Sequence, residues 1–295
     1  MKDVRDYGVV QNIADYQNDQ FAAAIDAATV AREALYIPPG IYNLSQPLRI
    51  SDHSTIIGEA GFAKTRLQFA TCNGIVPKDS AQNTTYAVIQ DIHLKCVSGE
   101  SAIGVWLLRS SRCLLRNLFI ENFNIGISID GTRHPTVNVH GAILNTIEHC
   151  TVSQQKTHAS AYAYGILLTG SKPVGVDGRA EANSIYGGYL QGELLINGEP
   201  NVGASICFDD GQGNNCYGTH FSGANHGVLF RSNYCGVYGG YTQIMGKSHV
   251  NFAAGSVGNT AMGIGATFTH GAVGVVDKGK SNIFQVAGTT NLRRV

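Results

Sequence analysis

Two short strand-like motifs recur in strict alternation along most of this chain, and this internal repeat limits its fold more than any other feature. The first motif is a turn followed by a strand and occurs as IQDIHL from Ile89, LRNLFI from Leu115, IEHCTV from Ile147, IYGGYL from Ile185, YGTHFS from Tyr217, VYGGYT from Val237 and IGATFT from Ile264. The second alternates with it as GVWLL from Gly104, GISID from Gly126, GILLT from Gly165, ASICF from Ala204 and GVLFR from Gly227. Because the spacers vary in length but not in order, the chain is expected to wind repeatedly round one axis.

This pattern predicts an all-β fold, a single-stranded right-handed parallel β-helix (solenoid) in which each circuit of the chain forms one rung. One rung cannot bury its inner face alone, whereas rungs stacked about 4.8 Å apart bury a continuous column of apolar side chains. We expect Ile127, Ile166 and Ile206 to lie in such a column. A leucine-rich horseshoe would need a constant repeat length, and a β-propeller would need blades of about 40 residues.

Composition excludes some classes of partner. The 295 residues carry 21 basic and 21 acidic side chains, and charged residues make up only 14% of the chain. A nucleic-acid partner is therefore not expected, because no basic patch is available to neutralise phosphates. Membrane insertion is not expected either, since no apolar run approaches the roughly 20 residues that span a bilayer. The seven cysteines show no CxxC pair, which favours free thiols over disulfides or zinc.

Four segments of the N-terminal third resemble a known superfamily: VRDYGVVQN (4–12), NDQFAAAIDAA (18–28), LYIPPGIYNLSQPLRI (35–50) and STIIGEAGFAKTRL (54–67). Together they are similar to the opening of the pectate-lyase-like β-helix superfamily, particularly of phage tailspike polysaccharide depolymerases. The superfamily opening is shared by lyases, hydrolases, epimerases and non-catalytic spikes. The chain departs from it at VVQNIADYQ (9–17), where a turn rich in Gly and Asp is usual.

The resemblance implies a homotrimer and a place in a virion tail or outside the cell. It also implies two parts, a first strand with an N-terminal capping helix over 1–34 and the parallel β-helix over 35–295. The residues agree with this division, because Phe21, Ile25 and Ala28 form one apolar helical stripe that can cover the open end of the column. The N-terminus lacks the apolar segment of a signal peptide, so we expect synthesis in the cytoplasm without a Sec signal.

Alternation within the strands predicts which side chains face outward. In NLFI, Leu118 and Ile120 face the core and Phe119 faces outward. The same register predicts one outward column: His93, Phe119, Thr151, Tyr189, Phe221 and Tyr241. Its aromatic members, Phe119, Tyr189, Phe221 and Tyr241, suit the apolar faces of sugars and are predicted to bind a polysaccharide substrate. The alternative is that this face packs against identical subunits or the C-terminal tail.

Long spacers concentrate in the middle of the chain, at about 131–144, 153–165, 170–183 and 191–203. Loops on a rigid repeat scaffold tend to carry function, which predicts a site in this zone. Alignment of ISID, ILLT and ICFD places Asp130, Thr169 and Asp209 at one strand end on successive rungs. Two rung spacings of about 4.8 Å separate the two carboxylates, which suits the acid and base of an inverting glycosidase.

The predicted catalytic residues are therefore Asp130 and Asp209, with Asp210 and Glu193 as further candidates. Each aspartate could instead cap a turn by accepting backbone hydrogen bonds. A uronate polysaccharide lyase would need a base and a cation beside the sugar carboxylate, and Arg133, His134 and Arg179 supply such groups as predicted substrate-binding residues. A non-catalytic glycan-binding adhesin or spike is the remaining alternative. No metal site and no cofactor are predicted, since neither histidines nor carboxylates show ligand spacing.

Overall fold

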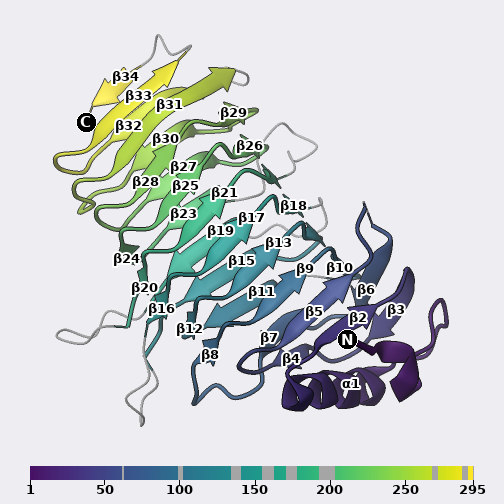
Figure 1. Ribbon diagram of the computed structural model, residues 1–295. Coiled ribbons are helices and arrows are strands. Elements are labelled where there is room, and N and C mark those ends of the chain that lie inside the picture. Colours follow the sequence, from purple (N-terminus) through teal and green to yellow (C-terminus); the bar gives the residue numbers. More distant parts are fainter. Residues whose placement is uncertain are drawn as a thin grey trace.

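The computed structural model is an elongated coil of stacked rungs with the N-terminus at one end and the C-terminus at the other (Figure 1). It describes residues 1–61, 63–98, 102–133, 141–154, 163–170, 178–192, 203–267, 272–287 and, for the backbone, 292–294. Nearly every strand pairs in parallel with the equivalent strand of the next rung. The chain is therefore a parallel β-helix, as the repeat predicts.

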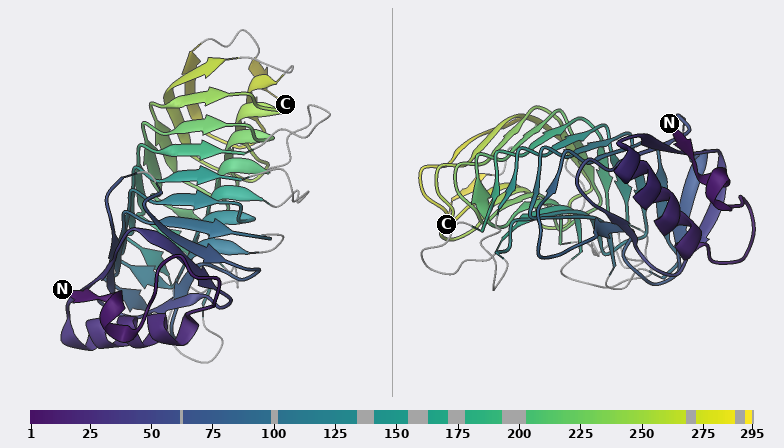
Figure 2. Two further views of the ribbon diagram at one scale, coloured as in Figure 1. Left: turned by 90° about the vertical axis from the view of Figure 1, so that its right-hand side faces the viewer. Right: turned by 60° about the horizontal axis from the view of Figure 1, so that its bottom comes forward.

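A short helical segment closes the N-terminal end. After β1 (Lys2–Asp3) and the single-turn 3-10 helix η1 (Val4–Tyr7), helix α1 (Asn18–Ala31) lies across the first rungs (Figure 2). The predicted stripe of Phe21, Ile25 and Ala28 is buried, together with Ala24. Asn18 is the first helical residue, and its side-chain oxygen accepts hydrogen bonds from the amides of Ser45 and Gln46.

Each complete rung contributes to three sheets. The longest strands form a ten-stranded sheet, which we call the long sheet: β4 (Leu48–Ile50), β7 (Ile75–Pro77), β11 (Ile103–Leu108), β15 (Ile125–Asp130), β19 (Tyr164–Thr169), β23 (Ala204–Phe208), β27 (His226–Phe230), β30 (Ser248–Phe252), β32 (Val273–Asp277) and β34 (Leu292–Arg294). Five two-residue strands follow it along the chain: β8 (Thr84–Thr85), β12 (Ser110–Ser111), β16 (Ala142–Ile143), β20 (Ala180–Glu181) and β24 (Gly211–Gln212).

The third sheet has two arms, because a tight turn divides each of its rungs. The first arm contains β2 (Ala34–Ile37), β5 (Thr55–Gly58), β9 (Val88–Gln90), β13 (Leu114–Arg116), β17 (Thr146–Glu148), β21 (Ser184–Tyr186), β25 (Asn215–Tyr217) and β28 (Gly236–Tyr238). The second arm contains β3 (Gly40–Leu44), β6 (Thr65–Phe69), β10 (His93–Cys96), β14 (Phe119–Glu121), β18 (Thr151–Ser153), β22 (Tyr189–Gln191), β26 (His220–Ser222) and β29 (Tyr241–Gln243). Both arms end on β31 (Thr260–Thr267), which pairs with β33 (Ile283–Ala287).

The core is the predicted stack of apolar columns. Ile127 pairs with Ile166, and Ile166 pairs with Ile206, so the expected isoleucine column is confirmed. A second column stacks aromatic rings, with Phe208 and Phe252 lying 5.0 and 4.9 Å from the ring of Phe230. All seven cysteines are free, and all but Cys72 are buried. Among the described residues, no helix is long and apolar enough to cross a membrane.

One predicted outward side chain points inward. Phe221 pairs with Leu190 and Thr242 and has none of its surface exposed, whereas His220 pairs with Tyr189 and Tyr241. The rung begins at Cys216, which occupies the core position of Ile185, and not at Tyr217. Because side chains alternate with a period of two, this one-residue offset exchanges the two faces of the strand. The assignment of Phe221 to substrate binding was therefore wrong, and His220 takes its place in the column.

Candidate functional site

The predicted aspartates lie together at the C-terminal ends of neighbouring strands in the middle of the long sheet. Asp130, the last residue of β15, pairs with Thr169, the last residue of β19. Asp209 follows β23 directly, and its amide donates to the Leu168 carbonyl at 2.8 Å, so it continues the same column. The Thr169 hydroxyl donates to Asp209 Oδ2 at 3.2 Å. The column therefore carries acid, hydroxyl and acid on three successive rungs.

Asp130 is held by contacts on both of its oxygens. Oδ1 accepts the Thr132 amide at 2.8 Å, which is the turn-capping contact that the alternative interpretation predicts, and Oδ2 accepts Trp106 Nε1 at 3.2 Å. The turn after Asp130 is fixed by buried Arg109, whose guanidinium donates to the carbonyls of Thr132 and Ser80. These contacts limit the rotamers that the Asp130 carboxylate can adopt.

Asp209 forms an ion pair with a residue of the next rung. Arg231, directly after β27, places Nη1 3.1 Å from Asp209 Oδ1. Burial acts to lower the pKa of Arg231, but the neighbouring Cys207, Asp209 and Tyr164 raise it above its ordinary value. For Tyr164, on the outer face of the same sheet, burial instead raises the pKa. A positively charged guanidinium is therefore held beside Asp209.

Asp210 differs from its neighbour because it is only 5% exposed. Its Oδ2 has no hydrogen-bond partner within the described part of the chain. A Cβ added to Gly170 would lie 3.2 Å from this oxygen and 2.2 Å from the Gly178 carbonyl, so the backbone is tightly packed here. A buried carboxyl oxygen without a partner is costly, and such groups concentrate at functional sites.

Two of the predicted substrate-binding residues reach the same corner. A Cβ on Gly131 would lie 2.2 Å from the Arg179 carbonyl, and one on Gly178 would lie 3.0 Å from the Arg133 amide. The backbones that carry Arg133 and Arg179 therefore run in contact beside Asp130. We name the group formed by Asp130, Thr169, Asp209, Asp210, Arg133, Arg179 and Arg231 the strand-end corner.

The predicted aromatic residues lie elsewhere. Phe119, Tyr189 and Tyr241 are in the outward column of the second arm, with Thr151 and His220. Along the chain, β15 separates this arm from Asp130, and at about 3.3 Å per residue its length is about 17 Å. The structure thus separates the predicted substrate-binding rings from the predicted catalytic carboxylates, on different sheets.

His93 begins the same column but is covered, with 2% of its surface exposed. Its Nδ1 accepts Arg66 Nε at 3.1 Å, and its Nε2 lies 3.0 Å from Glu121 Oε2. Glu121 also accepts Lys95 Nζ at 2.8 Å. Burial, reinforced by the charge of Arg66, lowers the pKa of His93 to about 4, so its ring is neutral at pH 7. Both ring nitrogens of His93 and both carboxylate oxygens of Glu121 therefore have partners within the chain.

Sequence reasoning missed a second tyrosine column. Tyr186, Tyr217 and Tyr238 project from the first arm with ring centroids 5.2 and 5.4 Å apart and planes 12° and 18° from parallel. The recurring Tyr-Gly pair at these three positions was the available signal. Arg231, Arg109 and Trp106 were also missed. Glu193 and His134 lie outside the described residues. Among those described, no three His, Cys, Asp or Glu side chains cluster as a metal site would require.

Comparison with known proteins agrees with this fold. Residues 1–84 match the family model described as rhamnogalacturonase A/epimerase, pectate lyase-like. Comparison with curated proteins gives no match. Among solved structures, ORF18 of Geobacillus virus E2 has a TM-score of 0.59 at 17% identity, over 97% of this chain and 61% of that one.

Two further structures are similar over nearly the whole chain. PfbA, a surface adhesin of Streptococcus pneumoniae, has a TM-score of 0.69 at 12% identity, over 99% of this chain and 80% of that one. The enzymatically active domain of tailspike protein 2 from bacteriophage CBA120 has a TM-score of 0.68 at 12% identity, over 97% of this chain and 42% of that one. This chain thus spans less than two thirds of both phage proteins. It has the right-handed parallel β-helix fold that its repeats predict, its first 84 residues match a pectate-lyase-like family model, and a phage tailspike shares the fold.

Proposed function

We propose that this chain binds a complex polysaccharide, such as a bacterial surface glycan, and cleaves it by glycoside hydrolysis at the strand-end corner. The observation that carries the proposal is the alignment of Asp130, Thr169 and Asp209 on three successive rungs. Two rung spacings place the two aspartate backbones about 9.6 Å apart. Inverting glycosidases keep their carboxyl groups about 6.5–9.5 Å apart to admit a water molecule, and retaining ones about 5–5.5 Å.

The contacts suggest a division of roles. Asp209 is paired with the Arg231 guanidinium and the Thr169 hydroxyl, which suits a carboxylate that activates water as the general base. Asp130 would protonate the leaving oxygen as the general acid, with Trp106 Nε1 orienting its Oδ2. Asp210, buried and without a partner for Oδ2, is the alternative acid. Arg133 and Arg179 would contact the substrate at the rim.

The similarity to phage tail proteins supports the wider setting. No contact of the described residues identifies a sugar, but the matched family is that of rhamnogalacturonase A and epimerases, and the similar tailspike domain is enzymatically active. We infer that the chain works as a homotrimer in a virion tail or outside the cell. Sedimentation analysis of the purified chain would test the trimer.

A uronate lyase is the second candidate, and the arginines favour it. The backbones of Arg133 and Arg179 run beside Asp130, and Arg231 is paired with Asp209, so their guanidinium groups could neutralise a sugar carboxylate before β-elimination. A lyase leaves a new C=C bond that absorbs ultraviolet light, whereas hydrolysis leaves saturated products. The third candidate, a non-catalytic adhesin, is favoured by the similarity to PfbA. It predicts glycan binding without any product.

The test is incubation with a panel of capsular and O-antigen polysaccharides, followed by mass analysis of the products. Hydrolysis predicts saturated fragments, and NMR of the first product should show an inverted anomeric centre. Asp130→Asn and Asp209→Asn should each lower the rate by about 10²–10⁴-fold.

The matched control for these variants is Asp277→Asn. Asp277 also ends a long-sheet strand and caps its turn, accepting the Gly279 amide at 3.1 Å. It lies outside the strand-end corner, so its variant should retain activity. Equal losses in all three variants would mean that the aspartates only cap turns, and unchanged product release in the first two would exclude the carboxylate pair.

A further inference from the structure

A pocket of about 310 Å³ lies on the second-arm side of the molecule, away from the strand-end corner. It is lined by Asp91, Asn117 and His149 from the turns between the two arms, and by Phe119 and Thr151 from the second arm. Ala60, Gly61 and Ala63 of the β5–β6 loop form its wall toward the N-terminus. Toward the C-terminus, the outward column continues from Thr151 to Tyr189, His220 and Tyr241.

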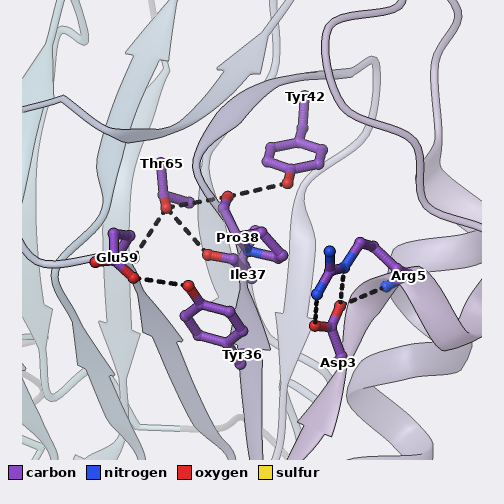
Figure 3. A network of polar contacts seen from close by, with 8 residues as sticks. All are labelled: Asp3, Arg5, Tyr36, Ile37, Pro38, Tyr42, Glu59 and Thr65. Atoms are coloured by element: carbon purple, nitrogen blue, oxygen red, sulfur yellow. Dashed lines mark hydrogen bonds and ion pairs between the residues drawn. The ribbon is translucent and has the colours of Figure 1, made fainter.

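The wall is held firmly at both ends. The Glu59 amide donates to Thr65 Oγ1 at 2.9 Å, and the Glu59 carboxylate accepts the Tyr36 hydroxyl at 2.7 Å (Figure 3). Thr65 Oγ1 in turn donates to the carbonyls of Ile37 and Pro38 (Figure 3). The pocket is therefore pre-formed, as binding sites for small molecules usually are.

The three turn residues of the pocket have left-handed backbones, with φ of 60° at Asp91, 50° at Asn117 and 51° at His149. The four rungs that follow have glycine at the equivalent position: Gly187, Gly218, Gly239 and Gly263. Polar side chains thus replace glycine only along the pocket, in a conformation that glycine adopts most easily. Asp, Asn and His tolerate this left-handed conformation, so their side chains can line the pocket without disturbing the backbone of the rung.

The lining suits one unit of a neutral sugar. The Phe119 ring, which packs against His93 at 4.6 Å, contributes apolar surface. Asp91 accepts Asn117 Nδ2 at 3.1 Å and Gln90 Nε2 at 3.2 Å, and the remaining capacity of this pair, together with the His149 ring and the Thr151 hydroxyl, can bond sugar hydroxyls. No Lys or Arg side chain lines the pocket as far as the structure describes it. Of the nearby cations, Arg66 is bonded to His93 and Lys95 to Glu121, while the half-exposed Lys64 lies 3.9 Å from Glu59. A polyanionic glycan would require such groups to be available.

The column beyond the pocket can support the rest of a glycan chain. Tyr189, His220 and Tyr241 meet edge to face, at interplanar angles of 72° and 89°, so these rings do not stack on one another in parallel. Beside them runs a second column of neutral polar side chains, in which Ser222 is buried and the others are at least partly exposed: Ser153, Gln191, Ser222 and Gln243. By contrast, the stacked rings of Tyr186, Tyr217 and Tyr238 cover one another's faces.

We propose that the second-arm face is a neutral-glycan-binding surface, separate from the strand-end corner, in which the pocket holds one end unit and the Tyr189–His220–Tyr241 column supports the chain. The surface would hold the polysaccharide while the corner acts on another part of it. This inference concerns binding and does not depend on the chemistry proposed for the aspartates.

The test measures binding to immobilised neutral O-antigen polysaccharides, with alginate as the polyuronate comparison, in an Asp130→Asn/Asp209→Asn background that prevents cleavage. The background protein should bind a neutral glycan as tightly as wild type does. Tyr189→Ala/Tyr241→Ala should weaken this binding about ten-fold. Asn117→Gly/His149→Gly, which keeps the left-handed turn, should weaken it by a similar factor. The matched control, Tyr186→Ala/Tyr238→Ala, removes exposed rings from the same rungs and should change it less than two-fold.

Several outcomes would overturn the proposal. They are preference for alginate, no binding of any neutral polysaccharide, an equal loss in the control pair, or loss of binding in the Asp background alone. A change of subunit assembly in sedimentation of Tyr189→Ala/Tyr241→Ala would instead identify the face as an interface between copies. If the glycan-binding variants behave as expected but the aspartate variants still release product, only the hydrolysis proposal fails.

Discussion

At the scale of single residues, buried amides link the rungs at the start of the first arm. Asn183 Oδ1 accepts the backbone amide and the side-chain amide of Asn145, both at 2.9 Å. Its Nδ2 donates to the Ala142 carbonyl and to Asn214 Oδ1. Asn214, Asn259 and Asn282 continue this ladder, with Cys235 interposed. Each amide satisfies backbone groups that the tight corner leaves unpaired.

Asn183→Ala should therefore be strongly destabilising. The change leaves the Asn145 amide and the Ala142 carbonyl buried without these partners, at a cost of about 1–3 kcal/mol for each unsatisfied group. Urea unfolding followed by circular dichroism measures the free energy of unfolding. The control is Asn215→Ala, which removes a single side-chain bond, to the Gly213 carbonyl. Equal loss in both variants would contradict the role of the ladder.

Buried histidines should make the fold sensitive to acid. Burial lowers the pKa of His249 to about 4, and burial with the Arg66 charge does the same for His93. An unfolded histidine has a pKa of about 6.5 and takes up its proton first, so stability is fully present above pH 6.5 and is lost as the pH falls toward 4. Urea unfolding at pH 7 and pH 5 should show a lower free energy at pH 5.

His249→Gln removes one of these groups and should reduce the loss between pH 7 and pH 5. His53→Gln, at an exposed ring stacked on Tyr86, is the control for changing a histidine. An identical pH dependence in wild type and His249→Gln would argue against buried histidine as the cause.

At the scale of elements, a column of glycines lets the second arm approach the long sheet. A Cβ on Gly126 would lie 2.4 Å from Val152 Cγ1 and 2.6 Å from the Gly165 carbonyl oxygen. Gly126→Ala should cost about 1–3 kcal/mol, because neither the valine nor the backbone can move without disturbing the next rung. Thermal unfolding would measure the loss.

Gly218→Asn is the comparison for this glycine. Nothing lies within 4 Å of a Cβ at Gly218, and Asn117 already occupies the equivalent left-handed position on a lower rung. The variant should therefore be nearly neutral. A larger loss for Gly218→Asn than for Gly126→Ala would mean that backbone conformation, and not close approach, limits these positions.

The residue patterns of the strands also explain which features of the fold could be predicted from the sequence. The long-sheet columns follow from alternation, because Ile127, Ile166 and Ile206 are equally apolar and each directly follows a small residue, glycine or serine. Phe221 was misplaced because Tyr217 resembles the start of its neighbours, while the true core residue, Cys216, is a weaker apolar signal. The Arg231 contact with Asp209 depends on how two rungs stack, which local sequence does not encode.

At the scale of the whole molecule, the sequence shows which residues share a column but not which face each column occupies. Asp130 and Phe119 are close in sequence, yet they belong to different sheets because a rung turns between β14 and β15. Whether the aspartates and the aromatic residues form one site depends on the cross-section of the coil, which the sequence does not show. The separation is what allows binding and cleavage to be assigned to different faces.

Stacking also makes the molecule nearly one-dimensional, since each rung contacts mainly its neighbours. Phe21 closes the N-terminal end of the core, with its ring edge-on to Tyr42 at 5.6 Å. Phe21→Ala should cost about 3–5 kcal/mol by leaving a cavity, and the loss should fall on the first rungs. Hydrogen exchange should therefore become faster in β2 and β3 while β27 and β30 remain as protected as in wild type. Val30→Ala, at an 87% exposed position of the same helix, is the control. Faster exchange along the entire coil would show instead that the rungs unfold as one cooperative unit.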